Sequence, residues 1–125
     1  MELSKSILLV DDSAVIRRSL RRAFEENGWD VRGEAGNGQE AIDVAQQLNP
    51  QVILLDLAMP GMNGITAARV LKRLLPDTYL MLFSLHADLV TPEQVHSSAF
   101  SAVVSKTESL PLLIEKAESL LKNAA

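Results

Sequence analysis

The sequence predicts a single α/β domain, a doubly wound five-stranded parallel sheet with helices on both faces. Short continuous apolar runs recur along the chain, and such unalternating runs are typical of parallel strands that are buried on both faces. Segments with helical periodicity lie between them, and this alternation implies right-handed crossovers. The 125 residues, 47% of them hydrophobic, are enough for one domain with a real core and leave no room for a second.

Five strands are expected. Four of them are apolar runs bounded by polar turns. The other has mixed composition, which favours a place at the edge of the sheet, and Gly28 and Gly36 punctuate its ends. The expected strands span residues 7–10, 29–35, 52–55, 79–83 and 102–104.

Five helices are expected between and after these strands, at residues 13–27, 38–48, 65–75, 87–99 and 110–121. Their apolar residues recur at helical spacing, most regularly in the last segment. Gly28 and Pro50 mark the ends of the first two helices. The segment 87–99 has the sparsest apolar residues, so we expect it to be mobile.

Composition excludes several classes of function. A net charge of −4 argues against a sequence-independent grip on nucleic acid, and 4% aromatic content argues against base-stacking platforms. The absence of cysteine excludes disulfides, thiolate zinc sites and a cysteine nucleophile. No stretch is long enough for a signal sequence or a membrane span, so we expect a cytoplasmic chain that binds neither DNA nor membranes directly.

Polar residues follow the expected strands at the point where each ends. They are Asp11, Asp12, Asp56, Ser84 and Lys106. Ligands of doubly wound sheets bind outside the carboxyl ends of the strands, so the fold and these residues select the same edge. Three carboxylates packed together repel unless a cation joins them or a proton is retained. Magnesium prefers such hard oxygen ligands.

Reactive chemistry is available at this edge. A carboxylate can accept a phosphoryl group and form an aspartyl phosphate, a step that needs charge neutralisation above all. Lys106 would neutralise the incoming group from the side opposite the metal, and Ser84 can donate a hydrogen bond to it.

The order and spacing of these residues, together with the stretch DLAMPGMNG at residues 56–64, resemble the receiver domain of two-component response regulators. The similarity covers essentially the whole chain, residues 1–125. It implies a flavodoxin-like (βα)5 fold with strand order 2-1-3-4-5. It further implies that Asp56 accepts a phosphoryl group from the phosphohistidine of a histidine kinase or a histidine phosphotransfer protein.

The resemblance also implies a magnesium site. Asp12 and Asp56 would bind the ion directly, Asp11 through a water molecule, and Ala58 through its backbone carbonyl. Lys106 would pair with the phosphoryl oxygens. Ser84 would move toward them and reposition the surface from the fourth helix to the fifth strand.

The chain departs from the family pattern near the last strand. Val103 stands where receivers usually carry an aromatic switch residue, and valine is too stiff to swing a ring. Phe100 would fill the missing volume or serve as an ordinary core aromatic. Leu85 replaces a small residue and could crowd the phosphoryl site.

Four arginines on the expected first helix, Arg17, Arg18, Arg21 and Arg22, form a basic face. The spacings of Arg21 to Glu25 and of Arg22 to Glu26 suit helical ion pairs, which favours a solvated face. The alternative is a docking surface for the phosphohistidine partner.

Other functions stay open as alternatives. An aspartate-nucleophile phosphatase would need a second acid two positions after Asp11, where Ser13 stands. A flavodoxin-like cofactor binder would need a phosphate-cradling loop after the first strand, and none is apparent. A degenerate receiver would act as an unphosphorylated interaction module.

The chain is expected to end after its last helix without an output domain. It would be a stand-alone receiver or, with a slight preference, the N-terminal receiver of a transcriptional regulator that dimerises on phosphorylation. It is not expected to be an enzyme beyond promoting its own phosphorylation and dephosphorylation.

Overall fold

The structure is a computed structural model and describes residues 5–57, 59, 61–85 and 100–122. The elements are β1 (Ser6–Val10), α1 (Ala14–Glu26), β2 (Asp30–Ala35), α2 (Gly38–Leu48), β3 (Val52–Leu55), α3 (Gly64–Leu74), β4 (Tyr79–Ser84), β5 (Ala102–Ser105) and α5 (Leu110–Lys122). The helix expected at residues 87–99, with its expected mobility, lies outside the described residues. None of the helices described here has the length and apolar character to cross a lipid bilayer.

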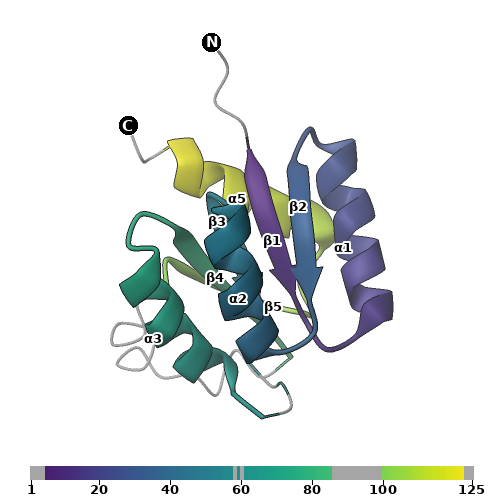
Figure 1. Ribbon diagram of the computed structural model, residues 1–125. Coiled ribbons are helices and arrows are strands. Elements are labelled where there is room, and N and C mark those ends of the chain that lie inside the picture. The colour runs from purple at the N-terminus through teal and green to yellow at the C-terminus, as the bar shows by residue number, and fades with distance from the viewer. Residues whose placement is uncertain (1–4, 58, 60, 86–99, 123–125) are drawn as a thin grey trace.

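The five strands form one parallel sheet with the order β2-β1-β3-β4-β5 (Figure 1). This order and the α/β class confirm the prediction, and the mixed strand β2 lies at an edge as expected. Each predicted strand boundary falls within one residue of the observed one. Continuous apolar runs were a reliable signal because β1 and β3 are buried along their whole length.

The sheet separates two hydrophobic clusters. Helices α2 and α3 cover one face, and α1 and α5 cover the other (Figure 1). Strand β1 supplies both clusters, since Leu8 and Val10 pack toward α2 and α3 while Ile7 and Leu9 pack toward α1 and α5. This alternation is the period-two geometry of a strand with two buried faces.

Side-chain caps start three of the helices directly after loops at the carboxyl edge of the sheet. Ser13, Asn37 and Asn63 each accept a hydrogen bond from the backbone N–H three residues on, at 3.3, 2.8 and 2.9 Å. Such caps satisfy backbone donors that the first turn leaves unpaired. They explain why α1 begins at residue 14, after its cap, and α3 at residue 64 rather than 65.

The only tryptophan of the chain, Trp29, lies between α1 and the start of β2. Its ring is 4% exposed and meets Phe24 edge to face, with centroids 5.3 Å apart. The Lys5 ammonium lies 5.6 Å from the ring centroid. Unfolding removes all of these neighbours, so tryptophan fluorescence is a suitable probe of global stability.

Candidate functional site

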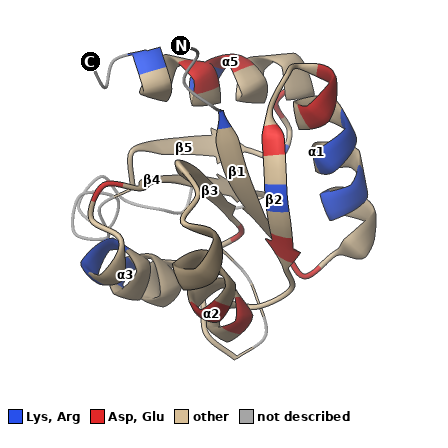
Figure 2. Cartoon of the chain, turned by 45° about the horizontal axis from the view of Figure 1, so that its top comes forward, with Lys and Arg blue, Asp and Glu red and all other residues tan. Residues whose placement is uncertain are grey.

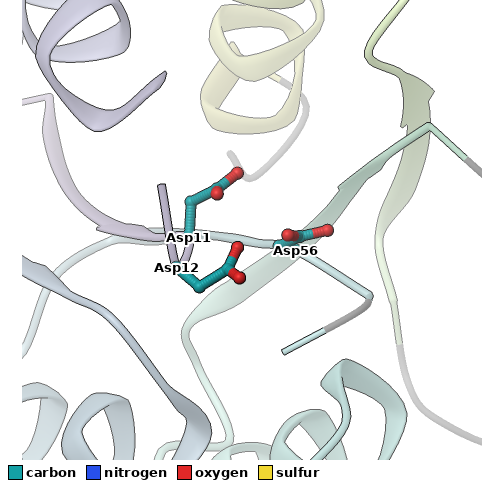
Figure 3. Close-up of side chains that lie close together, drawn as sticks. All are labelled: Asp11, Asp12 and Asp56. Carbon is teal, nitrogen blue, oxygen red and sulfur yellow. The ribbon is translucent and has the colours of Figure 1, made fainter. Parts of the chain in front are cut away.

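Three carboxylates meet at the carboxyl edge of the sheet. Asp11 and Asp12 follow β1, and Asp56 follows β3 (Figure 3). One potential ligand oxygen from each lies within 4.8 Å of the other two. The backbone sets this placement, because the N–H of Asp11 donates to Ala35 at 3.0 Å and that of Asp56 to Val10 at 2.9 Å. Both residues therefore directly follow their strands, and their N–H groups continue the hydrogen bonding of the sheet by one residue.

The three carboxylates have unequal surroundings. The Asp11 and Asp56 side chains are only 2% and 6% exposed, whereas Asp12 is exposed. Asp11 Oδ1 accepts a hydrogen bond from the Ser13 N–H at 2.9 Å. The cluster thus has a buried, anchored part and a solvent-facing part, which suits a small cation that retains bound water on its open side.

Lys106 supplies the positive charge at the base of the cluster. Its Nζ lies 2.7 Å from Asp11 Oδ2 and 3.3 Å from Asp56 Oδ2, and its side chain is 10% exposed. Burial acts to lower the pKa of Lys106, but hydrogen bonding and charge attraction to Asp11 and Asp56 outweigh it and raise the pKa. The ammonium also lies 5.8 Å from the centroid of the Phe83 ring. Lys106 is therefore a fixed cation.

A hollow of about 220 Å³ opens over these groups. Its lining residues are Asp11, Asp12, Ser13, Ile16, Asp56, Ser84, Leu85 and Lys106. Ser84 is 1% exposed, and its carbonyl accepts the Lys106 N–H at 2.9 Å. Leu85 lines the same hollow but is 62% exposed. All five residues singled out at the strand ends thus lie around one hollow, whereas Ala58, the expected backbone ligand, lies outside the described residues.

The loop after β3 is closed by Gly64, the last residue of the stretch at 56–64 that resembles receiver domains. The sequence did not predict the close backbone contact that this glycine makes. Gly64 donates its N–H to the Leu57 carbonyl at 2.8 Å. A Cβ at position 64 would stand 2.4 Å from the Asp56 carbonyl oxygen, closer than real Cβ atoms approach any heavy atom. Only glycine fits this approach. The available signal was a glycine directly after an Asn cap, at a position where helix propensity disfavours it.

Two of the residues that depart from the family pattern, Phe100 and Val103, pack against the core. Phe100 is 8% exposed and belongs to the cluster beneath α2 and α3, with Val103 packed partly buried against that cluster. Phe100 is a buried core aromatic in the same cluster as Val103, which fits both expectations for this residue. Val103 contacts the same cluster but has no ring to turn.

We expect Asp12→Asn to raise the thermal midpoint of the metal-free protein by a few degrees. The variant removes the solvent-facing charge from a group of three mutually repelling carboxylates. Unfolding of both proteins would be followed by Trp29 fluorescence in the presence of a chelator and again with Mg²⁺.

Mg²⁺ should raise the midpoint of wild type more than that of the variant, because a ligand stabilises the state that binds it. Asp30→Asn, at a carboxylate paired with Arg32 on β2, is the control. A midpoint lowered by Asp12→Asn in the chelator would show that repulsion is not the dominant effect there.

Comparison with known proteins assigns the family. Residues 7–118 match the model of the response regulator receiver domain. The chain is 48% identical over 82 residues, 65% of its length, to a protein-glutamate methylesterase/protein-glutamine glutaminase of Alkalilimnicola ehrlichii, and 35% identical over 116 residues, 91% of its length, to the transcriptional regulatory protein PdtaR of Mycobacterium tuberculosis. These matches cover 21% and 55% of the respective relatives, so the chain spans only part of their length.

A solved structure agrees with the sequence comparisons. The response regulator domain of Thermotoga maritima CheB superposes with a TM-score of 0.84 at 26% identity, covering 94% of this chain and 96% of that one. Both kinds of comparison, over most of the chain, point to one family. The chain therefore belongs to the response regulator receiver domains.

Proposed function

We propose that the chain is a phosphoryl-accepting switch in which Asp56 takes a phosphoryl group from a phosphohistidine, in a step that depends on Mg²⁺. The donor would be a histidine kinase or a histidine phosphotransfer protein. The observation that carries the proposal is the convergence of Asp11, Asp12 and Asp56 with Lys106 around one hollow.

Asp56 is the carboxylate best placed to react. It lies at the end of the central strand β3 and lines the hollow, with Lys106 Nζ 3.3 Å from its Oδ2. Asp11 lies beside it, with its carboxylate accepting hydrogen bonds from the Ser13 N–H and from Lys106. In the proposed step an Asp56 oxygen attacks phosphorus, the phosphorus–nitrogen bond breaks, and the donor imidazole leaves with its electron pair. Lys106 keeps its proton and stabilises the transferred charge.

The donor set fits magnesium. Receiver domains bind Mg²⁺ at an acidic pocket, and three carboxylates with a solvent-facing opening provide such a pocket here. We propose that Asp12 and Asp56 bind the ion directly, Asp11 through a water molecule, and Ala58 through its carbonyl. The bound ion would neutralise charge on the phosphoryl group.

The proposed output runs through the ends of β4 and β5. Ser84 ends β4 and Lys106 directly follows β5, and the Lys106 N–H donates to the Ser84 carbonyl at 2.9 Å. A phosphoryl group that attracts the Ser84 hydroxyl and the Lys106 ammonium would act on both strands together, and so on the surface between the fourth helix and β5. Dimerisation of the phosphorylated form through this region is part of the proposal.

For the whole protein, we propose a role as the receiver of a transcriptional regulator. The similarity to the transcriptional regulatory protein PdtaR, at 35% identity over 91% of the chain, supports this output. The chain itself would catalyse only its own phosphorylation and dephosphorylation. A receiver that works as an unphosphorylated interaction module is the alternative.

Exposure to a small phosphoryl donor, followed by measurement of the protein mass, tests the proposal. Exposed to acetyl phosphate and Mg²⁺, wild type should gain the mass of one phosphoryl group, and beryllofluoride should shift the amide signals of residues around the hollow. Asp56→Asn should show neither response because the acceptor oxygen is gone. Asp43→Asn, on the exposed side of α2, is the matched control and should respond like wild type.

An adduct that persists in Asp56→Asn would contradict the assignment of the acceptor. A wild type that responds to neither reagent would support the unphosphorylated interaction module instead.

A further inference from the structure

An ionic bridge joins α1 to the edge strand β2 beside the acidic hollow. Glu34 on β2 receives Arg17 Nε at 3.0 Å on Oε1 and Arg21 Nε at 2.7 Å on Oε2. The three side chains are 20–34% exposed. Each carboxylate oxygen thus accepts a charge-assisted hydrogen bond from a different guanidinium. Figure 2 shows this basic side of α1 next to β2.

The charges in the bridge reinforce one another. Burial acts to raise the pKa of Glu34, but hydrogen bonds from Arg21 and Arg17 outweigh it, so the pKa lies below its ordinary value. The hydrogen bond that Arg21 donates to Glu34 in turn raises the pKa of Arg21. The bridge therefore stays ionised throughout the neutral range and holds Arg17 in one place.

The other end of Arg17 reaches the acidic loop. Its Nη1 donates to the main-chain carbonyl of Asp11, and it would stand 3.6 Å from a Cβ at Gly36. The remaining polar atoms of Asp11 are held as well: its N–H by Ala35 and its carboxylate by Ser13 and Lys106. Arg17 supplies the contact that orients the carbonyl, and this carbonyl defines the peptide plane between Asp11 and Asp12.

We propose that Arg17, anchored by Glu34, is a positioning residue for the acidic hollow: it sets the peptide plane from which the Asp12 carboxylate projects toward a bound divalent cation. Arg17 does not touch the cation or the reacting atoms. Residues that hydrogen-bond to metal-binding groups, without contacting the metal, orient those groups, and their loss lowers metal affinity. Arg17 would act in this way. The inference rests on the proposed magnesium site.

An electrostatic role and a positioning role of Arg17 predict opposite changes in cation affinity when the residue is replaced. Removing a positive charge beside three carboxylates should tighten cation binding if only the electrostatic field mattered. Removing a residue that holds the loop should weaken binding, because Asp12 would then sample orientations that do not bind. The sign of the change thus separates the two explanations.

The test compares Arg17→Met with wild type and with the matched control Arg22→Met in the full chain. Arg22 is on the same helix and also pairs with a glutamate, Glu26, but its side chain is 83% exposed. Mg²⁺ would be titrated while the backbone amide signals of Asp12 and Ser13 are recorded by NMR. We expect Arg17→Met to bind Mg²⁺ about tenfold more weakly and Arg22→Met to match wild type.

Two further observations isolate the positioning role. In the metal-free protein, the Asp12 and Ser13 amide signals should move in Arg17→Met but not in Arg22→Met. Arg17→Lys keeps the charge but lacks the planar fork, so it should recover only a minor part of the lost affinity. Trp29 fluorescence checks that each variant is folded.

Glu34→Gln provides a second route should Arg17→Met fold poorly. It leaves Arg17 in place but removes its anionic anchor, so Mg²⁺ binding should weaken in the same direction. The double variant Arg17→Met/Glu34→Gln should bind Mg²⁺ no more weakly than Arg17→Met alone, because both changes disrupt the same contact between Glu34, Arg17 and the Asp11 carbonyl.

Unchanged or tighter Mg²⁺ binding in Arg17→Met would overturn the positioning role while leaving the magnesium site intact. A wild type that binds no Mg²⁺ would overturn the proposed site itself, and the role of Arg17 with it.

Discussion

Lys106→Met should destabilise the metal-free protein by ~3–5 kcal/mol at neutral pH, the cost typical of removing one partner from a buried ion pair. Lys106 lies within 3.3 Å of two carboxylates whose side chains are at most 6% exposed. Without its ammonium, Asp11 and Asp56 would be left buried with like charges facing each other. Denaturant unfolding followed by Trp29 fluorescence measures the difference.

The pH dependence of this effect has a definite sign. The folded state raises the pKa of Lys106 above its ordinary value of 10.5. Its stabilising contribution is therefore fully present below that ordinary value and is lost only as pH rises through the raised pKa. The difference in unfolding free energy between wild type and Lys106→Met should therefore not fall as pH rises through the neutral range, and should narrow in strong alkali.

Lys116→Met is the matched control for Lys106→Met. Lys116 pairs with Glu108 at 3.4 Å, but its side chain is 38% exposed, so we expect a loss of at most ~1 kcal/mol. Mg²⁺ should reduce the difference in stability between wild type and Lys106→Met, because a bound cation replaces part of the missing positive charge. If Lys106→Met were as stable as wild type in the chelator, the lysine would not be the counter-charge of the cluster.

Gly64→Ala should destabilise the fold by ~1–3 kcal/mol, as overpacking of a close contact does. The new methyl group would stand 2.4 Å from the Asp56 carbonyl oxygen and 2.9 Å from the Leu57 Cα, and both are backbone atoms. Relief requires the loop after β3 to shift, and that loop carries Asp56. The variant should therefore also form the Asp56 adduct more slowly with acetyl phosphate.

Helix propensity alone predicts the reverse for this substitution. Gly64 begins α3, and alanine in a helix is favoured over glycine by about 1 kcal/mol. Gly36→Ala is the control, since its Cβ would meet only Arg17 Nη1, at an ordinary 3.6 Å. A Gly64→Ala variant more stable than wild type would show that the loop yields without cost.

The strand pattern was predictable because burial on both faces leaves a direct trace in the sequence. Strand β3 and helix α2 have the predicted bounds, and Asn37 and Pro50 bracket the helix. Strand order required the family resemblance, since apolar runs alone do not say which strands are neighbours. The five residues at the strand ends could be found because parallel strands finish at one edge.

The contacts of the arginines on α1 could be predicted from the sequence only within the helix. The helical pairs Arg21–Glu25 and Arg22–Glu26 follow from spacing, and the structure has them at 3.3 and 3.4 Å. The contacts of Arg17 and Arg21 with Glu34 span 17 and 13 residues. They depend on how α1 packs on β2, which no local pattern encodes. Lys106 is similar, since its pairing with Asp11 depends on side-chain direction rather than strand order.

Main-chain hydrogen bonds fix where the residues of the site lie, independently of the chemistry of their side chains. Asp11, Asp56 and Lys106 are each held by a main-chain N–H that bonds a neighbouring strand, whatever side chain the residue carries. The positions of these residues therefore do not depend on the identity of their side chains, although the stability of the site does, since Lys106 neutralises two buried carboxylates. The main-chain hydrogen bonds thus place the acidic cluster whatever residues stand at positions 85 and 103.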